Sequence, residues 1–326
     1  MKKLFSTKAM VIALPVVIVV IIIAIIIRLT LWDRGFFTHE PDWSAIEADI
    51  GAESSDFYIM RNPAEVNNPD GITTIVLLGD DTFAGERGKS GVAAYLTEYT
   101  GATVYNCAFE GALGASYFPS FNVEYGNDSF SLYRIAAATA ADDFILQKAY
   151  LDVTSMRKDY FEDTINLLED INFKNVDVFV LNFGINDYLA DFPVVNSEDG
   201  MDIATYLGSM RRALDLIQSH YPEATIVVSG PHYVDYLADD GTYLPGDRTK
   251  NGAGYLLSTF MRSTLEECQG RSITFLDNYF GMDYIRTEPD TYLEDDHKTL
   301  TEEGRKKLAE RIAYAIVYRL GYEFKN

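Results

Sequence analysis

Short apolar runs alternate with longer segments of helical periodicity from residue 73 to residue 320. The runs are rich in valine, isoleucine and leucine, and several end at a glycine or a polar residue, as buried strands do. Strands that alternate with helices favour βαβ units and a sheet covered on both faces. We therefore expect an α/β fold, a three-layer α/β/α sandwich around a mainly parallel five-stranded sheet. The expected strands are 73–78, 102–105, 176–182, 225–229 and 273–276, and the expected helices are 90–99, 130–150, 160–171, 203–220, 255–268 and 301–320.

The net charge of the chain limits the classes of partner that such a domain can bind. The chain has 326 residues, with 27 Lys and Arg against 49 Asp and Glu, and a formal net charge of −22. Nucleic acid is excluded as a partner, because its phosphates would be repelled. A hydrophobic content of 48% excludes an intrinsically disordered chain. Cys107 and Cys268 provide no disulfide framework, and both a bond between them and two buried free thiols stay open.

An unbroken apolar run over residues 10–27 predicts a helix that spans a membrane. About 20 residues are needed to cross roughly 30 Å of hydrocarbon, and we place the anchor at residues 9–29. Lys2, Lys3 and Lys8 precede the run, so we expect residues 1–8 in the cytoplasm and the remainder outside the cell membrane. A cleavable signal peptide is the alternative, but no cleavage pattern precedes Trp32. Residues 30–71 are then a stalk and residues 72–322 one extracytoplasmic domain.

Polar blocks follow the first three expected strands, and a fourth block precedes the last expected helix. Sites in parallel sheets lie beyond the carboxyl ends of the strands, so these loops are where chemistry is expected. The blocks are Gly-Asp-Asp-Thr at 79–82, Asn-Cys-Ala-Phe-Glu-Gly at 106–111, Gly-Ile-Asn-Asp at 184–187 and Asp-Asp-His-Lys-Thr at 295–299.

The order and placement of the four blocks resemble the SGNH/GDSL hydrolase family over residues 72–320. This resemblance implies an SGNH/flavodoxin-like fold and a serine esterase that needs no cofactor. In that family the serine of a Gly-Asp-Ser motif attacks the acyl carbon, and three donors hold the oxyanion. Gly111 and Asn186 match two of those donors, and Asp80 matches the aspartate of the motif. A turn glycine and a loop cap are the simpler roles of Gly111 and Asn186 when each is taken alone.

The chain departs from the family pattern at the nucleophile, where Asp81 stands in the serine position. A carboxylate is a poor nucleophile toward an ester, because the resulting anhydride reverts readily. It also puts negative charge where the oxyanion would form, beside Asp80. The substitution predicts the loss of ordinary esterase chemistry.

The catalytic base has two alignments. The family's histidine usually stands five residues before the glycine in the first turn of the last helix, and here that position is Thr299, with Asp296 as the carboxylate. On this register the histidine is lost. The other register keeps His297 as the base, with Glu294 as its partner, and needs two extra residues before the helix. Both registers stay open, a solvated loop histidine is the default for His297, and His232 is the least implausible substitute.

Two further interpretations concern ligands. Aspartates near the blocks could converge on Mg²⁺ or Ca²⁺, although chance clustering is expected in so acidic a chain, and we predict no metal site. Tyr117, Phe118 and Phe121 are candidates for a platform on which a sugar ring stacks, although core packing is the commoner role of aromatic residues. The aspartates are Asp80, Asp81, Asp187, Asp295 and Asp296.

These features together predict a membrane-anchored extracytoplasmic protein that binds an O-acylated carbohydrate, or a similar ester, of the cell envelope. Because the serine is replaced, we expect impaired catalysis. An active ester hydrolase or O-acyltransferase with an atypical set of catalytic residues is the second hypothesis. A structural or interaction ectodomain that reuses the fold is the third.

Overall fold

The computed structural model describes residues 21–22, 41–59, 73–118, 120, 122 and 124–322. The expected membrane anchor at residues 9–29 lies outside the described residues except for positions 21 and 22. Within the described ranges, no helix is both long enough and apolar enough to cross a membrane.

Five parallel strands form the central sheet, in the order β2-β1-β3-β4-β7. Every residue of β1, β3, β4 and β7 is buried, which explains why their sequences are apolar runs rather than alternating patterns. The expectation of a mainly parallel five-stranded sheet is confirmed. The strands are β1 (Thr74–Gly79), β2 (Thr103–Asn106), β3 (Val178–Asn182), β4 (Thr225–Ser229) and β7 (Thr274–Leu276).

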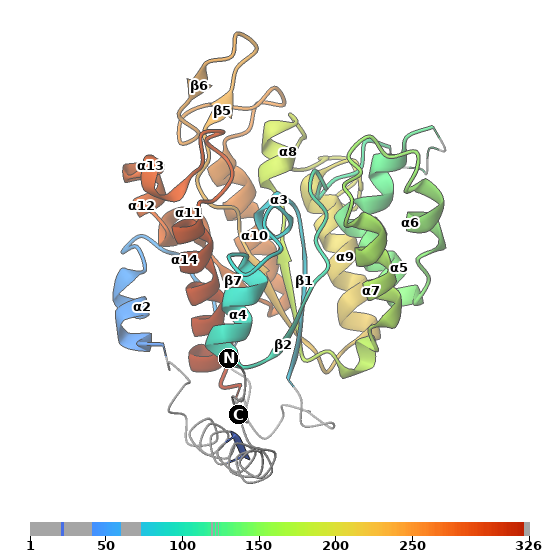
Figure 1. Cartoon of the computed structure of the whole chain (residues 1–326). Coiled ribbons are helices and arrows are strands. Elements are labelled where there is room, and N and C mark those ends of the chain that lie inside the picture. The colour runs from blue at the N-terminus through green and yellow to red at the C-terminus, as the bar shows by residue number, and fades with distance from the viewer. Residues whose placement is uncertain are drawn as a thin grey trace, which may run out of the picture. The chain divides into compact units, whose positions relative to one another are not determined.

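Helices cover both faces of the sheet (Figure 1). In this view the strands run between α4 and α14 on one side and α5, α7 and α9 on the other, and α4 packs against α14 while α5 packs against α9. The helices around the sheet are α3 (Asp81–Ala84), α4 (Val92–Thr100), α5 (Leu132–Ala141), α6 (Ile145–Tyr150), α7 (Phe161–Asp170), α8 (Ile185–Leu189), α9 (Tyr206–His220), α10 (Leu257–Arg271), α11 (Asn278–Gly281), α12 (Tyr284–Thr287), α13 (Pro289–Tyr292) and α14 (Glu302–Ala313).

The single helix expected over residues 130–150 is wrong. A 3₁₀ turn at Gly126–Phe130 leads into α5, which ends before α6 begins. Asp142 adopts a left-handed conformation (φ 51°), and its backbone N–H donates to the carbonyls of Ala138 and Thr139. A left-handed residue at this position ends a helix, and aspartate tolerates that conformation better than most residues do. The last expected helix also changes character, because α14 passes into a π-helix at Tyr314–Arg319.

Residues 42–59, which lie within the expected stalk, contact the edge of the sheet. They include a short helix, α2 (Trp43–Asp49). Phe57 and Phe275 of β7 exchange two antiparallel backbone hydrogen bonds of 2.9 and 2.8 Å. Asp56 forms an ion pair of 2.9 Å with Arg311 of α14, and the two side chains are only 9% and 5% exposed. This segment therefore covers the β7 edge, which would otherwise offer unpaired backbone groups.

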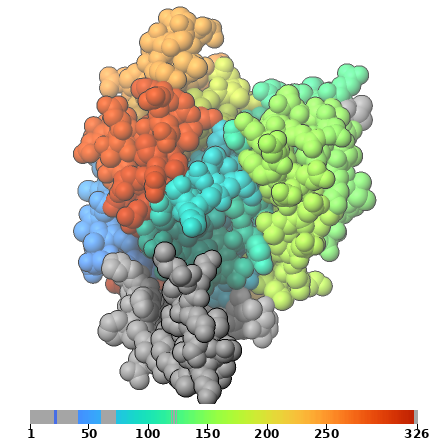
Figure 2. Space-filling view, in the orientation of Figure 1, coloured from blue at the N-terminus to red at the C-terminus, as the bar shows by residue number. Residues whose placement is uncertain are grey.

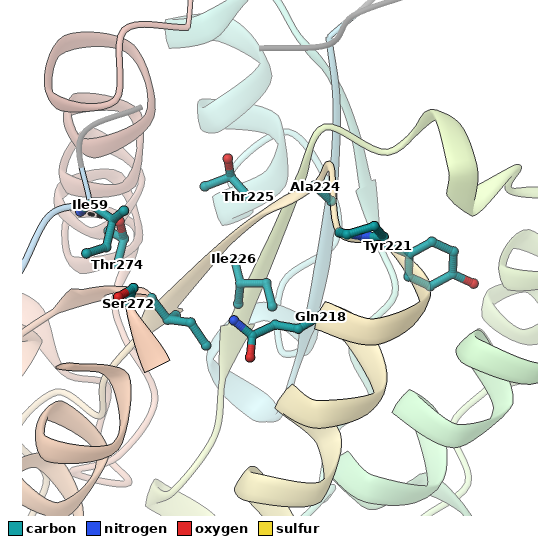
Figure 3. A pocket seen from close by; sticks show the side chains of 10 residues that line it. Ile59, Gln218, Tyr221, Ala224, Thr225, Ile226, Ser272 and Thr274 are labelled. Atoms are coloured by element: carbon teal, nitrogen blue, oxygen red, sulfur yellow. Dashed lines mark hydrogen bonds between the residues drawn. The ribbon is translucent and has the colours of Figure 1, made fainter. Parts of the chain in front are cut away.

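The two ends of the sheet differ in chemistry. At the carboxyl end, a hairpin of β5 (Tyr236–Leu237) and β6 (Tyr243–Leu244) projects from the domain, orange at the top of Figure 2. At the amino ends of β4 and β7, a cavity of about 140 Å³ is lined by residues such as Gln218, Thr225 and Thr274 (Figure 3). Among the described residues around this cavity there is no carboxylate, amine or imidazole, whereas the carboxyl end of the sheet carries titratable side chains.

Candidate active site

Asp81 is the first residue of α3, and only Asp80 separates it from the end of β1. Its carboxylate oxygen Oδ1 accepts hydrogen bonds from the backbone N–H of Gly111 and from Asn186 Nδ2, the latter at 3.3 Å. The Asp81 side chain is only 15% exposed. The structure thus brings together the residues of the first three blocks, and a carboxylate oxygen occupies the point on which the two donors converge.

The two donors are held by the backbone around them. Gly111 has a φ of 82°, a left-handed conformation that glycine adopts without strain. Asn186 Nδ2 also donates to the carbonyl of Ala112, at 3.0 Å. The neighbouring Asp187 is fully buried and accepts hydrogen bonds of 2.7 Å from the backbone N–H groups of Gly114 and Ala115. Asp187 therefore stabilises the loop that follows Gly111. Burial raises the pKa of Asp187 to about 6.

Lys298 supplies the positive charge of the site. Its ammonium group forms an ion pair with Asp81 Oδ2. Burial alone would lower the pKa of Lys298, but the Asp81 carboxylate and its hydrogen bond outweigh burial and raise that pKa. The Lys298 carbonyl accepts a hydrogen bond of 3.1 Å from the ring nitrogen Nε2 of His232. Asp81 therefore has a cation as a partner as well as two neutral donors.

Asp80 caps α3 and does not face the donors. Its oxygen Oδ1 accepts from the backbone N–H of Thr82 at 3.1 Å, whereas Oδ2 is buried without a partner among the described residues. Burial, reinforced by the charge of Asp81, raises the pKa of Asp80 to about 8. This carboxyl group is thus mostly protonated at neutral pH.

His297 has a different carboxylate partner from the one expected. Its Nδ1 lies 2.8 Å from Asp235 Oδ2, and its ring stacks on Tyr243 of β6 with 4.1 Å between the centroids. Glu294 instead lies 4.0 Å from Arg305. The backbone N–H of Asp235 donates to the His297 carbonyl, and His297 itself has a φ of 55°. Asp235 is not among the predicted site residues, and its only signal in the sequence is its place in the loop after β4.

Asp296 and Thr299 form the pair expected for the other register. Thr299 Oγ1 donates to Asp296 Oδ2 at 2.6 Å, and the Thr299 backbone N–H donates to Asp296 Oδ1 at 2.7 Å. Burial raises the pKa of Asp296, but these hydrogen bonds more than compensate and hold that pKa below its usual value. Since a threonine hydroxyl cannot act as a general base at neutral pH, this pair orders the loop without providing catalysis.

His232, the substitute suggested for the missing base, contacts the backbone of Lys298. Its side chain is buried, and burial lowers its pKa to about 4. The ring is therefore neutral at physiological pH, with Nε2 directed at the Lys298 carbonyl. Its other nitrogen, Nδ1, has no partner among the described residues.

A cavity of about 290 Å³ opens beside Asp81 and Lys298. Its wall includes apolar side chains, and Tyr117 and Tyr125 lie at its margin with their rings 4.9 Å apart in an edge-to-face arrangement. Tyr117 is 46% exposed and Phe118 is 38% exposed, whereas Phe121 lies outside the described residues. The cavity is lined by Asp81, Gly111, Leu113, Ala115, Tyr117, Tyr125, Asn127, Asp128, Ser131, Asn186, Leu189, Ala190 and Lys298, and His297 is not among these residues.

Two other expectations concern metals and thiols. Within the described ranges, no group of three or more His, Cys, Asp or Glu side chains is arranged to hold a metal ion. Cys107 and Cys268 are both buried free thiols. Of the two alternatives left open by the sequence, the structure therefore has two free thiols and not a disulfide.

Neither a protein-family model nor a curated protein matches the chain. Solved structures do match. A protein from Lactobacillus plantarum is 16% identical with a TM-score of 0.51, over 76% of this chain and 97% of that one. A carbohydrate acetylesterase from Sinorhizobium meliloti is 12% identical (TM-score 0.46; 76% and 99% covered), and a member of the lipolytic protein G-D-S-L family from Veillonella parvula DSM 2008 is 12% identical (TM-score 0.44; 76% and 98% covered).

The sheet order, the convergence of the first three blocks at its carboxyl edge and the likeness to solved structures agree with one another. At such low identity the likeness bears on the fold and not on the activity. The chain has an SGNH/GDSL-like fold.

Proposed function

We propose that this chain is a membrane-anchored extracytoplasmic protein that binds an O-acylated carbohydrate, or a similar ester, of the cell envelope and is impaired as an ester hydrolase. The observation that carries the proposal is the position of the Asp81 carboxylate. It accepts from Gly111 and Asn186, the two donors that would otherwise hold a developing oxyanion.

Loss of hydrolysis follows from the occupancy of these donors. An ester carbonyl that entered the site would meet a carboxylate in place of a hydroxyl nucleophile. Its oxygen could reach Gly111 and Asn186 only after Asp81 had left them. The Lys298 ion pair opposes that departure, because it satisfies the other oxygen of Asp81. Gly111, Asn186 and Lys298 thus already have a negatively charged partner when no substrate is bound.

Ligand binding is supported by the cavity beside the pair. Leu113, Ala115 and Leu189 provide apolar wall, and Tyr117 and Tyr125 provide ring faces and hydroxyl groups. A sugar that carries a short acyl group offers both apolar and hydrogen-bonding surface, and a mixed lining of this kind suits it. The ligand class itself comes from the resemblance to the family and from the compartment.

The compartment rests on the N-terminal sequence. Residues 10–27 are apolar, and Lys2, Lys3 and Lys8 precede them. A single-pass anchor with a cytoplasmic N-terminus would hold the domain outside the cell.

The full-length wild-type protein is tested with a small activated acetyl ester and with a fluorophosphonate probe, which labels activated serines. We expect turnover no higher than that of Asp81→Ala, and no labelling. Asp81→Ser restores a hydroxyl beside Gly111 and Asn186, and we expect some turnover and labelling to return. Robust turnover by the wild type that is unchanged in Asp81→Ala would contradict the proposal that ester hydrolysis is impaired.

One observation favours the second candidate, an active hydrolase or acyltransferase. The pair of His297 and Asp235 has the geometry of an imidazole oriented by a carboxylate, and the His297 side chain is 36% exposed. If this pair activated an acceptor hydroxyl or a water molecule, wild-type turnover would be lost in His297→Ala and in Asp235→Asn. An inactive wild type that also fails to bind acetylated oligosaccharides would favour an interaction ectodomain.

A further inference from the structure

Side chains from two distant segments hold the loop that carries the donor Gly111. Arg87 contacts this loop from the connection between α3 and α4, and Tyr160 contacts it from the position directly before α7. Neither is among the described residues that line the Asp81 cavity. Arg87 and Tyr160 therefore act on the loop and not directly on a group bound in the cavity.

Tyr160 binds the backbone next to the donor. The backbone N–H of Glu110 donates to the Tyr160 hydroxyl at 3.1 Å, whereas the next N–H, that of Gly111, donates to Asp81 Oδ1. Peptide units are planar, so only the φ and ψ of Glu110 lie between these two N–H groups. Tyr160 thus fixes the peptide plane that directly precedes the plane of the Gly111 donor.

The start of the loop lies at an open edge of the sheet, because β2 is an edge strand. The N–H groups of Cys107 and Phe109 donate to carbonyls of β1 at 2.9 and 3.1 Å. Successive residues of an extended chain direct their backbone groups to opposite sides, so the carbonyls of Asn106 and Ala108 face away from β1. Both residues are buried, and a buried carbonyl without a donor is costly.

Arg87 supplies the donors for these two carbonyls. Its Nη2 donates to the Asn106 carbonyl at 2.5 Å, and its Nη1 donates to the Ala108 carbonyl at 3.0 Å. Asn106 Oδ1 also accepts from the backbone N–H of Ala108 at 3.2 Å. A guanidinium group carries several donors in one plane, so it can bind two carbonyls at a fixed spacing, which a single ammonium group cannot do.

The two side chains also contact each other. The guanidinium carbon of Arg87 lies 4.4 Å from the centroid of the Tyr160 ring, within the range of a cation–π interaction. Burial raises the pKa of Tyr160 to about 12, although the hydrogen bond from Glu110 and the charge of Arg87 oppose this rise. The pair is therefore a cation over a neutral ring at physiological pH, and it contacts the loop on both sides of Phe109.

We propose that Tyr160 and Arg87 are positioning residues, which direct the Gly111 N–H at Asp81 or at an oxyanion in its place. The exposed ion pair of 2.8 Å between Lys158 and Glu110 reaches only the Glu110 side chain and not its backbone. The inference rests on the proposed function only in treating Gly111 as a donor to a bound oxyanion.

The test uses the full-length Asp81→Ala protein, in which acetate can take the position of the missing carboxylate. We expect Tyr160→Phe in this background to bind acetate about fivefold more weakly, which is the effect of losing one hydrogen bond. Arg87→Met should weaken acetate binding at least as much. Arg87→Lys should not restore it, because lysine keeps the charge but lacks the paired donors. Calorimetric titration at constant ionic strength measures these affinities.

Tyr221→Phe is the matched control. The Tyr221 hydroxyl donates to the carbonyl of Thr139 at 2.6 Å, and Tyr221 lines the cavity at the amino ends of β4 and β7 (Figure 3). In the Asp81→Ala background, this change should lower the melting temperature about as much as Tyr160→Phe does, because each removes one hydrogen bond to the backbone. The acetate affinity should remain that of Asp81→Ala.

Hydrogen exchange in the full-length protein that retains Asp81 is the second measurement. The Gly111 amide should exchange several-fold faster in Tyr160→Phe than in the wild type, whereas the Ala115 amide, which donates to Asp187, should be unchanged. Equal acetate affinity with and without the Tyr160 hydroxyl, equal weakening in Tyr221→Phe, or no acetate binding by Asp81→Ala would each overturn the proposal. Ester hydrolysis by the wild type would contradict the proposed function and would leave these comparisons unaffected.

Discussion

Lys298 pairs with Asp81 across 217 positions of sequence, at the place where the resemblance predicts a nucleophile and its base. The Asp81 carboxylate is only 15% exposed, and a carboxylate that is largely removed from water needs a cation nearby. Lysine supplies that cation. Where the resemblance implies a nucleophile and a base, the site therefore contains an ion pair, and Gly111 and Asn186 donate to its carboxylate.

Removing the cation should destabilise the fold measurably. Lys298→Met leaves Asp81 partly buried without its ion-pair partner, so we expect a loss of about 1–3 kcal/mol in the free energy of unfolding, below the range for fully buried pairs because Lys298 is 27% exposed. Urea denaturation at pH 7 measures it.

Lys148→Met is the matched control, because Lys148 pairs with Glu169 at the surface, where both side chains are more than a third exposed. Exposed pairs contribute at most about 1 kcal/mol. Equal losses in the two variants would mean that Asp81 does not depend on Lys298.

Removing the carboxylate should create a binding site for a free one. In Asp81→Ala, Gly111, Asn186 and Lys298 surround the vacated position. Acetate should therefore raise the melting temperature of Asp81→Ala in a concentration-dependent way, because a ligand that binds only the folded state stabilises it. Wild type, in which Asp81 fills the site, should respond less. Chloride at equal ionic strength controls for screening, and identical acetate responses in both proteins would contradict the geometry.

The sheet and the ends of its strands could be predicted from sequence, because buried parallel strands are continuous apolar runs such as those in β1 and β3. Since the carboxyl ends of neighbouring parallel strands meet, the approach of Gly111 and Asn186 to Asp81 could be expected as well. The break at Asp142 was not predicted, because the alanine-rich sequence before it gives no sign of where the helix stops.

The charged partners in the site could not be predicted. Which of His297 and Lys298 faces Asp81 depends on the backbone at His297, which is left-handed. In this conformation the His297 side chain contacts Asp235 and Tyr243. Asp235 lies 62 positions earlier, in a loop with no motif of its own. Contacts of this kind are set by how distant loops pack, and local sequence patterns carry no information about them.

Asp80 should make the fold less stable as the pH rises. Its pKa is near 3.9 in an unfolded chain, whereas burial raises it to about 8 in the folded protein. Between these values the folded state holds a proton that the unfolded state has released, so stability falls as the pH increases. Asp187 acts in the same direction up to about pH 6.

Asp80→Asn removes this dependence, because the amide cannot ionise and asparagine can still cap α3. Each pKa unit corresponds to about 1.4 kcal/mol, and we expect the variant to gain roughly 2–4 kcal/mol over wild type between pH 5 and pH 8. Urea denaturation across this range measures the difference. If the free energy of unfolding changed with pH in the same way in both proteins, the pKa of Asp80 would not be raised in the folded state.

The N-terminal run should keep the protein in the membrane. With Lys2, Lys3 and Lys8 before residues 10–27, we expect the full-length chain in the membrane fraction at its complete mass of 36.6 kDa. Protease added outside the cytoplasm should digest the domain, because this topology places only residues 1–8 inside. A soluble form that begins near residue 30 would instead indicate a cleaved signal peptide.

Rebuilding the nucleophile and base separates the two registers of the last block. Thr299 already forms the hydrogen bonds to Asp296 that the resemblance assigns to a catalytic histidine, whereas His297 is paired with Asp235 and does not line the cavity. We therefore expect Asp81→Ser alone to hydrolyse an activated acetyl ester weakly. Asp81→Ser combined with Thr299→His should be faster by about 10²-fold, because a positioned base contributes at least that much.

Two additional variants identify the base in the serine background. His297→Ala should leave the turnover of Asp81→Ser unchanged, because its imidazole is engaged elsewhere. Lys298→Met tests whether the neutral amine of Lys298 deprotonates the new serine, since without Asp81 the pKa of Lys298 is no longer raised by that carboxylate. If His297→Ala abolished the turnover of Asp81→Ser while Thr299→His added nothing, the register with His297 as the base would be the functional one, and the Asp235 pair would be its orienting carboxylate.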